Sequence, residues 1–170
     1  MTLFSAHHID SDPTNNDLLN LIPLCPNCHI LDQHDPTAEI DRSKLRLFRQ
    51  YRNPTILAPQ FQPLFHRLKF LDEIEDDTDI KELQRNAQEL ISFVADLEMG
   101  TFYSERIADL TRKPKYASIT IIGDPVSEAR RRDRLVKEAQ EYRDILRTNR
   151  DAVIALVVEL LRFQSWQPQQ

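Results

Sequence analysis

Apolar and polar positions divide the chain into a short N-terminal part with two strands and a longer helical part. Residues 2–9 (TLFSAHHI) and 18–24 (LLNLIPL) are predicted to form short strands. The segment between them, residues 10–17 (DSDPTNND), is rich in turn-forming residues and is predicted to be a loop. From Pro26 onward we expect a helix. The predicted order is therefore strand, loop, strand, helix.

A second helix is predicted over residues 38–52, with Asp41 or Ser43 as its N-cap. An Asn-Pro dipeptide ends this helix, because the residue before a proline disfavours helical backbone. The next segment, residues 54–63, contains three prolines, and we interpret it as a linker. The N-terminal domain is accordingly predicted to cover residues 1–53.

The second domain, predicted at residues 64–170, is expected to be helical. Apolar residues recur at steps of three and four along a helix at 79–99 and along a long helix at 126–164. Such seams pack against another helix, either within the same chain or in a partner. Asn149 is the one polar position in the second seam, and in a dimer it would set the register.

Two shorter elements are expected between these long helices. Gly100 is predicted to cap the end of the first helix, and a short helix is predicted near 103–112. Residues 116–122 (YASITII) are β-prone and end at a Gly-Asp-Pro turn. The chain contains only two glycines, which favours helices over a β-sandwich. The predicted fold class is α+β, mainly α.

Composition bears on where the protein is located and on the partners that it could bind. The chain has 170 residues, of which 41% are hydrophobic, and no apolar run approaches the roughly 18 residues that a membrane span needs. The N-terminus also lacks the features of a signal peptide, so we expect a cytoplasmic protein with no membrane association. The net charge of −5 argues against a broad DNA-coating surface.

Candidate metal ligands and bases are concentrated near the N-terminus, where four of the five histidines lie within the first 34 residues. His7 and His8 are adjacent on a predicted strand and should point to opposite faces. Asn20 follows the loop, and its side chain is placed to pin the loop backbone by hydrogen bonds. His29, early in the predicted helix, is placed to return to the same metal as the strand.

This arrangement resembles the HNH nuclease motif, a ββα-metal finger. The resemblance is carried by Ala-His-His-Ile at 6–9, by Asn-Leu-Ile-Pro-Leu-Cys at 20–25 and by the Cys-His pair at 28–29. With the basic helix that follows, it covers about residues 3–52, roughly a third of the chain. The implied fold is a small ββα finger followed by a helical, coiled-coil-like domain.

The resemblance also implies a role for each residue of the motif. His7 and His29 occupy metal-ligand positions, and His8 occupies the position of the general base that activates water. Asn20 matches the central asparagine that fixes the loop and orients the base. Because the loop lacks glycine, Asn15-Asn16 is expected to supply any left-handed turn.

A third metal ligand is expected beyond His29. Asp32 and His34 follow it by three and five residues, and the i+3 position stays closer to the ligand face, which favours Asp32. The implied cofactor is a divalent cation, with Mg²⁺ favoured and Mn²⁺, Ni²⁺ and Zn²⁺ as alternatives. One such ion with two or three protein ligands leaves coordination sites for a phosphate.

Cys25 and Cys28 depart from the usual pattern of the family, in which an upstream Cys-x-x-Cys shares a structural Zn²⁺ with the later pair. Only six residues precede His7, and two cysteines supply half of a tetrahedral zinc site. Three interpretations stay open: N-terminal residues are missing from this sequence, the cysteines are buried apolar groups, or a partner completes the zinc site.

Basic residues offer a second kind of candidate. Along the second predicted helix, the possible phosphate-binding residues are Arg42, Lys44, Arg46 and Arg49, together with Arg52. Arg130-Arg131-Arg132 and Arg134 begin the last helix in the same way. In both places the alternative is a solvated helix face.

The resemblance implies a DNA endonuclease that acts in bacterial or phage restriction or defence beside a partner subunit, such as an ATPase. The C-terminal helices would then form a homodimer or bind that partner. Two alternatives are a catalytically degenerate finger that serves as a binding or assembly module, and a nuclease or toxin that cleaves RNA.

Overall fold

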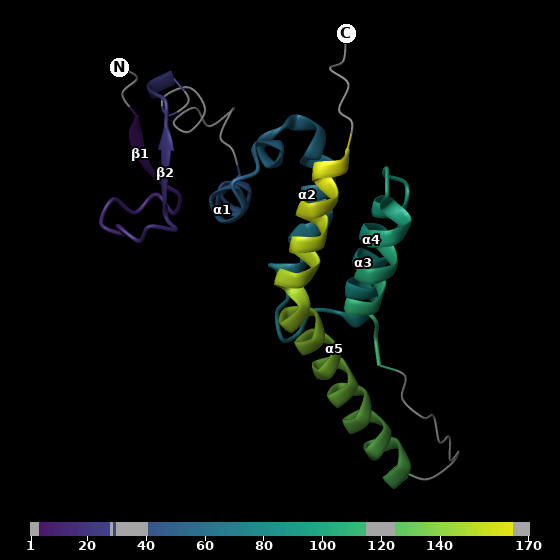
Figure 1. Cartoon of the computed structure of the whole chain (residues 1–170). Coiled ribbons are helices and arrows are strands. Elements are labelled where there is room, and N and C mark those ends of the chain that lie inside the picture. The colour runs from purple at the N-terminus through teal and green to yellow at the C-terminus, as the bar shows by residue number, and fades with distance from the viewer. Residues whose placement is uncertain (1–3, 28, 30–40, 115–124, 165–170) are drawn as a thin grey trace. The chain divides into compact units, whose positions relative to one another are not determined.

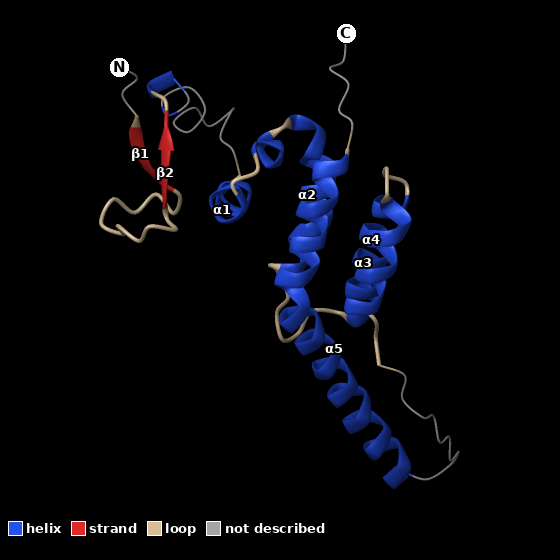
Figure 2. Cartoon of the chain, viewed as in Figure 1, coloured by secondary structure: helices blue, strands red, loops and turns tan. Residues whose placement is uncertain are grey.

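The computed structural model describes residues 4–27, 29, 41–114 and 125–164 (Figure 1). The chain divides into two compact units, an N-terminal unit at residues 1–62 and a C-terminal unit at residues 63–170. Helices predominate, and the described strands form one two-stranded antiparallel sheet (Figure 2). The coarse prediction of an α+β chain that is mainly α is therefore confirmed.

The N-terminal unit contains the predicted hairpin, with shorter strands than the apolar pattern indicated. Strand β1 (Ser5–His8) pairs antiparallel with strand β2 (Leu21–Leu24), and His7 lies opposite Ile22. Directly paired residues share a face of the sheet, so His7 lies on the face of the buried Ile22 side chain. His8, the next residue, lies on the other face.

Helix α1 (Arg42–Tyr51) covers the inner face of this hairpin. Leu45 is fully buried and packs with Ile9 and Ile22 in one cluster. Of the two predicted caps, Asp41 is the one used, because its side chain accepts a hydrogen bond from the Ser43 backbone N–H at 2.8 Å. The helix therefore begins three to four residues later than its predicted start.

The Pro-rich segment after α1 is folded rather than an extended linker. It forms two 3-10 turns, Pro54–Leu57 and Pro59–Phe61. Ile56 and Phe61 are both buried, and the first turn packs against α1. Pro54 and Pro59 set the backbone angle that opens each turn, and Pro63 is the second residue of the helix that follows.

The C-terminal unit is a small helical assembly. Helix α2 (Gln62–Leu68) begins at the boundary and runs into a 3-10 turn, Lys69–Leu71. The remaining helices are α3 (Ile80–Ala95), α4 (Gly100–Leu110) and the long α5 (Pro125–Leu160), which ends in a 3-10 turn. Helices α3 and α4 pack side by side, and α5 packs against both.

Both apolar seams face the core of this unit. The buried seam residues are Leu83, Ala87, Leu90 and Val94 on α3, and Ala139, Tyr142, Leu146, Val153 and Leu160 on α5. Asn149, the polar seam position, donates its side-chain N–H to the Leu110 carbonyl at the end of α4, at 2.8 Å. The seams are thus used within the chain, and Asn149 satisfies a helix-end carbonyl.

Three arginines of α5 hold the loop before α3. Arg143 donates twice to the Thr78 carbonyl, at 2.8 and 3.1 Å. Arg147 donates to the Ile74 carbonyl at 3.0 Å and pairs with a carboxylate of the same loop. Arg150 pairs with Asp72. Hydrogen bonds from a charged donor are the stronger kind, so this row ties the loop to the long helix.

Gly100 has a different role from the predicted helix cap. Helix α3 ends at Ala95, the left-handed residue is Met99 with φ 61°, and Gly100 is the first residue of α4. A Cβ atom at this glycine would lie 2.0 Å from the Val94 carbonyl oxygen. The β-prone segment at 116–122 lies outside the described residues. None of the described helices combines the length and apolar character needed to cross a bilayer.

Replacing Gly100 with alanine should destabilise the C-terminal unit. The added methyl group collides with backbone, which cannot move aside as a side chain can, so we expect a loss of about 1–3 kcal/mol. Thermal unfolding of the full chain by circular dichroism measures the effect, with the exposed neighbour in Thr101→Ala as control. Equal midpoints for the two variants would contradict the close approach.

Candidate functional site

Two of the predicted metal ligands lie next to each other in the N-terminal unit. The ring centroids of His7 and His29 are 5.4 Å apart, with the planes at 73°, although more than twenty residues separate them in sequence. His7 is on β1, and His29 follows β2 in a helical turn in which its N–H donates to the Cys25 carbonyl at 2.8 Å. Two imidazoles in contact are a suitable pair of donors for a divalent metal.

His8 ends β1 on the face opposite His7 and is half-buried. Its Nε2 lies 3.4 Å from the side-chain oxygen of Asn16, a long contact to an atom that only accepts hydrogen bonds. The contact is a hydrogen bond if Nε2 carries the ring proton, and Nδ1 would then be the accepting ring atom.

Asn20 joins the two ends of the loop between the strands. Its side-chain oxygen accepts from the Asp10 N–H at 3.0 Å, and its Nδ2 donates to the Asp10 carboxylate and to the Asn15 carbonyl, both at 2.9 Å. Its own carbonyl accepts from the Ile9 N–H at 2.9 Å. This is the side-chain to backbone bonding expected of Asn20 from the sequence, and it fixes the backbone that follows His8.

The rest of the loop is held by carboxylates that cap its backbone. Asp10 accepts from the Asp12 N–H at 2.8 Å, and Asp12 in turn accepts from the Thr14 N–H at 2.9 Å. The left-handed residue is Ser11, with φ 64°, so the expectation that Asn15-Asn16 supplies this turn is wrong. A local hydrogen-bonding network thus compensates for the missing glycine.

The same bonds change the acidity of the loop. The Asp12 N–H and the Asn20 amide donate to Asp10 and lower its pKa from 3.8 to about 2. The Thr14 hydroxyl and N–H donate to Asp12 and lower its pKa, and the electrostatic interaction with nearby His8 lowers this pKa further. Both carboxylates are therefore ionised throughout the neutral range.

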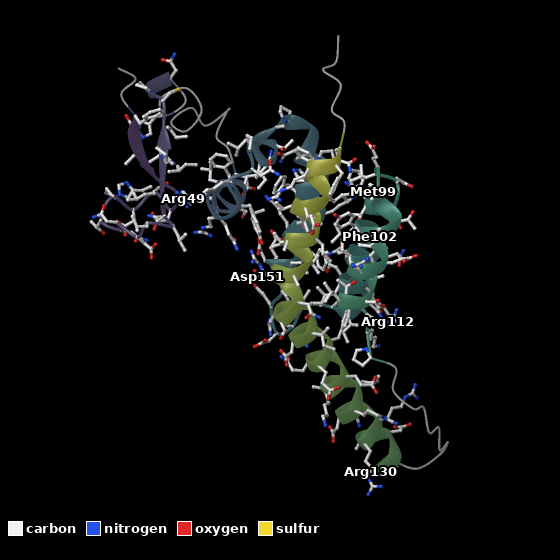
Figure 3. The ribbon with its side chains drawn as sticks, in the orientation of Figure 1. Arg49, Met99, Phe102, Arg112, Arg130 and Asp151 are labelled. Atoms are coloured by element: carbon white, nitrogen blue, oxygen red, sulfur yellow. The ribbon has the colours of Figure 1, made fainter. Side chains whose placement is uncertain are left out.

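Helix α1 braces the loop from the other side. Arg42 donates to the Ser11 hydroxyl at 2.9 Å, and the Nε of Arg49 donates to the Leu18 carbonyl at 3.0 Å. Figure 3 shows Arg49 on α1, on the side of the loop. This bracing was not predicted from the sequence. The signal for it is the spacing of seven residues, which places both arginines on one face of α1.

The basic residues of α1 that were predicted to bind phosphate are not all exposed. Lys44 is 6% exposed, and burial lowers the pKa of its ammonium group, so it does not belong to an exposed basic face. Arg46 is exposed, and with Arg49 it lines a hollow of about 450 Å³ beside the loop. The other lining residues are Asp10, Asn15, Asp17, Leu19, Asn20 and Gln50.

Several predicted site residues lie outside the described part of the chain: Cys28, Asp32 and His34. Cys25 is half-buried at the end of β2. Within the described ranges, no group of three or more histidine, cysteine or acidic residues is placed to hold a metal ion. The described donor set is therefore the His7–His29 pair, and the third ligand and the zinc site stay predictions.

No family model matches this chain, and the comparisons with curated proteins and with solved structures likewise gave no match. The functional argument therefore depends on the residues themselves.

Substituting Asn20 by alanine should release Asp10. With one of its donors gone, we expect the pKa of the Asp10 carboxyl to rise from about 2 toward 3.8. Because the folded-state value is the lower one, this carboxylate stabilises the wild-type unit above pH 4 and loses its effect as the pH falls toward 2.

Carbon-detected NMR titration of the Asp10 carboxyl measures the shift, and Asn16→Ala is the matched control because the Asn16 side chain bonds to His8 and to the Thr14 carbonyl instead of that carboxylate. An unchanged Asp10 pKa in the Asn20 variant would contradict the bridging role.

Proposed function

We propose that this protein is a metal-dependent endonuclease of the HNH type that hydrolyses DNA phosphodiester bonds. The observation that carries the proposal is the contact between the His7 and His29 rings, which brings together the two residues that occupy ligand positions in the resembled motif. His8 follows His7 at the end of β1, directly before the loop that Asn20 anchors. The four residues that carry the resemblance thus lie in one small unit.

Each residue would contribute a distinct step of hydrolysis. His8 would take a proton from water at Nδ1 as the water oxygen bonds to phosphorus and the ester oxygen departs. A divalent cation held by His7 and His29, Mg²⁺ or a related ion, would supply positive charge at the phosphate. Asn20 would act as a positioning residue, because its hydrogen bonds fix the backbone directly after the base.

The setting follows the resemblance. We infer a cytoplasmic enzyme of restriction or phage defence that works with a partner subunit, either a second copy of the chain or an ATPase. The C-terminal unit uses its seams internally, so its exposed surfaces are the ones available to a partner or to nucleic acid.

Cleavage tests the proposal directly. Supercoiled plasmid is incubated with the full chain and Mg²⁺ or Mn²⁺, and nicked or linear product is measured on gels. We expect His8→Ala to lower the rate by roughly 10²–10⁴-fold, the usual contribution of a general base. His66→Ala is the control, because this exposed histidine belongs to α2.

The alternatives are separate outcomes of that assay. Cleavage of RNA with intact DNA would identify the RNA-directed enzyme. If both nucleic acids stay intact in Mg²⁺, Mn²⁺, Ni²⁺ and Zn²⁺, the finger is a binding or assembly module and the enzymatic proposal is wrong.

Metal affinity separates the two neighbouring histidines. Calorimetric titration with Mn²⁺ should show weaker binding for His29→Ala and His7→Ala, because each removes one donor of the pair. His8→Ala should bind nearly as the wild type, because His8 lies on the other face of β1. An equal loss in the His8 and His29 variants would refute this division of roles.

A further inference from the structure

The first part of α5, residues 128–137, is the most exposed helical segment of the C-terminal unit. Every residue of this segment is exposed, whereas the helix becomes buried on one side from Ala139 onward. Figure 1 shows the segment extending past the ends of α3 and α4, and Figure 3 places Arg130 near its tip. We call residues 128–137 the basic arm.

The charge of the arm is opposite to that of the chain. It contains five basic residues, Arg130, Arg131, Arg132, Arg134 and Lys137. Two acidic residues, Glu128 and Asp133, reduce its net charge to +3, against −5 for the whole protein. A local positive segment on an acidic chain attracts anions to one place instead of coating the surface.

The arginines of α5 fall into two groups that differ in their hydrogen bonds and ion pairs. Arg143, Arg147 and Arg150 are tied to the loop before α3 by hydrogen bonds and ion pairs. Across the described ranges, no such bond engages the four arginines of the arm. Contacts within the folded unit therefore give Arg143, Arg147 and Arg150 a structural role, but they give none to the arginines of the arm.

The arm presents part of its charge as a stripe. Arg130, Arg134 and Lys137 follow i, i+4, i+7 spacing, and they lie on the side of α5 turned away from the buried Ala139 and Tyr142. The stripe extends about 10 Å along the helix axis, a length over which duplex DNA carries several phosphates. Lys137 also has an exposed 3.8 Å ion pair within α5, which is weak enough to be exchanged for a phosphate.

We propose that the basic arm of α5 binds the phosphate backbone of duplex DNA and adds affinity to that of the N-terminal unit. This inference rests on the proposed function for its choice of DNA as the partner. In the N-terminal unit, Lys44 is buried and Arg42 and Arg49 brace the loop, which leaves Arg46 and Arg52 as exposed basic side chains without such a role.

A second copy of the chain is the competing occupant, because Leu135 and Val136 are 52% and 68% exposed. Arg134 and Lys137 flank these two side chains directly, and Arg131 and Arg132 lie one turn earlier. Two arms packed together would each bring a net charge of +3, so like charges oppose that pairing, while DNA neutralises them.

Fluorescence anisotropy with a labelled DNA duplex of mixed sequence, in EDTA, tests the arm on the full chain. The arm variant carries Arg130→Gln, Arg134→Gln and Lys137→Gln. The control carries Lys81→Gln, Arg85→Gln and Arg112→Gln, which remove the same charge from exposed positions of the same unit. We expect the arm variant to bind at least about tenfold more weakly, with the salt slope reduced by about 2 to 3, and the control to bind nearly as the wild type.

Equal binding by the two triple variants, or no DNA binding by the wild type, would overturn the proposal. Tighter binding of the arm to duplex RNA than to duplex DNA would also overturn it. The same holds if light scattering shows a dimer that the double variant Leu135→Ser, Val136→Ser abolishes, and DNA binding does not depend on the arm. If DNA binding depends on the arm but the plasmid is not cleaved in Mg²⁺, this inference stands and the proposed function is wrong. If the plasmid is cleaved but DNA binding does not depend on the arm, the proposed function stands and this inference is wrong.

Discussion

The candidate site depends on bracing a hairpin that is too small to be stable alone. Its two strands have four residues each, and isolated two-stranded hairpins are at best marginally stable in water. Leu45 of α1 supplies the apolar cover for Ile9 and Ile22. Asn20 supplies polar bonds at the loop end of the hairpin, where it ties the residues after β1 to those before β2. The positions of His7 and His8 follow from these two contacts, because both residues are on β1.

Charge in this protein is placed locally and mostly used for structure. The carboxylates of Asp10 and Asp12 cap backbone N–H groups, and this bonding keeps them ionised. Arg42 and Arg49 meet the same loop from α1, so acidic and basic side chains there balance within one unit. The arginines of the basic arm, by contrast, are exposed and make no such bonds among the described residues. The overall charge of −5 hides that distribution.

Local patterns predicted the elements better than they predicted the contacts between elements. The hairpin, the Asp41 cap and the two apolar seams were predicted from the spacing of residues close in sequence, and the structure contains each of them. Gly100 was assigned as a cap from residue preference, whereas its real constraint is a carbonyl from the preceding turn. Lys44 was grouped with its charged neighbours, but the packing of α1 buries it. Both errors concern packing contacts that residue preferences do not record.

The candidate site itself shows the same division. The sequence placed His7, His8, Asn20 and His29 in one segment, but it could not tell which ring faces which. The register resolves this, because His7 shares the face of Ile22 while His8 shares the face of Leu21. Under the proposed function, His7 and His29 would then hold a cation on the face of the hairpin that carries Ile22. Exchanging the two roles would place the ligand on the face away from His29, so the order of the two histidines along β1 is itself a physical argument for this assignment.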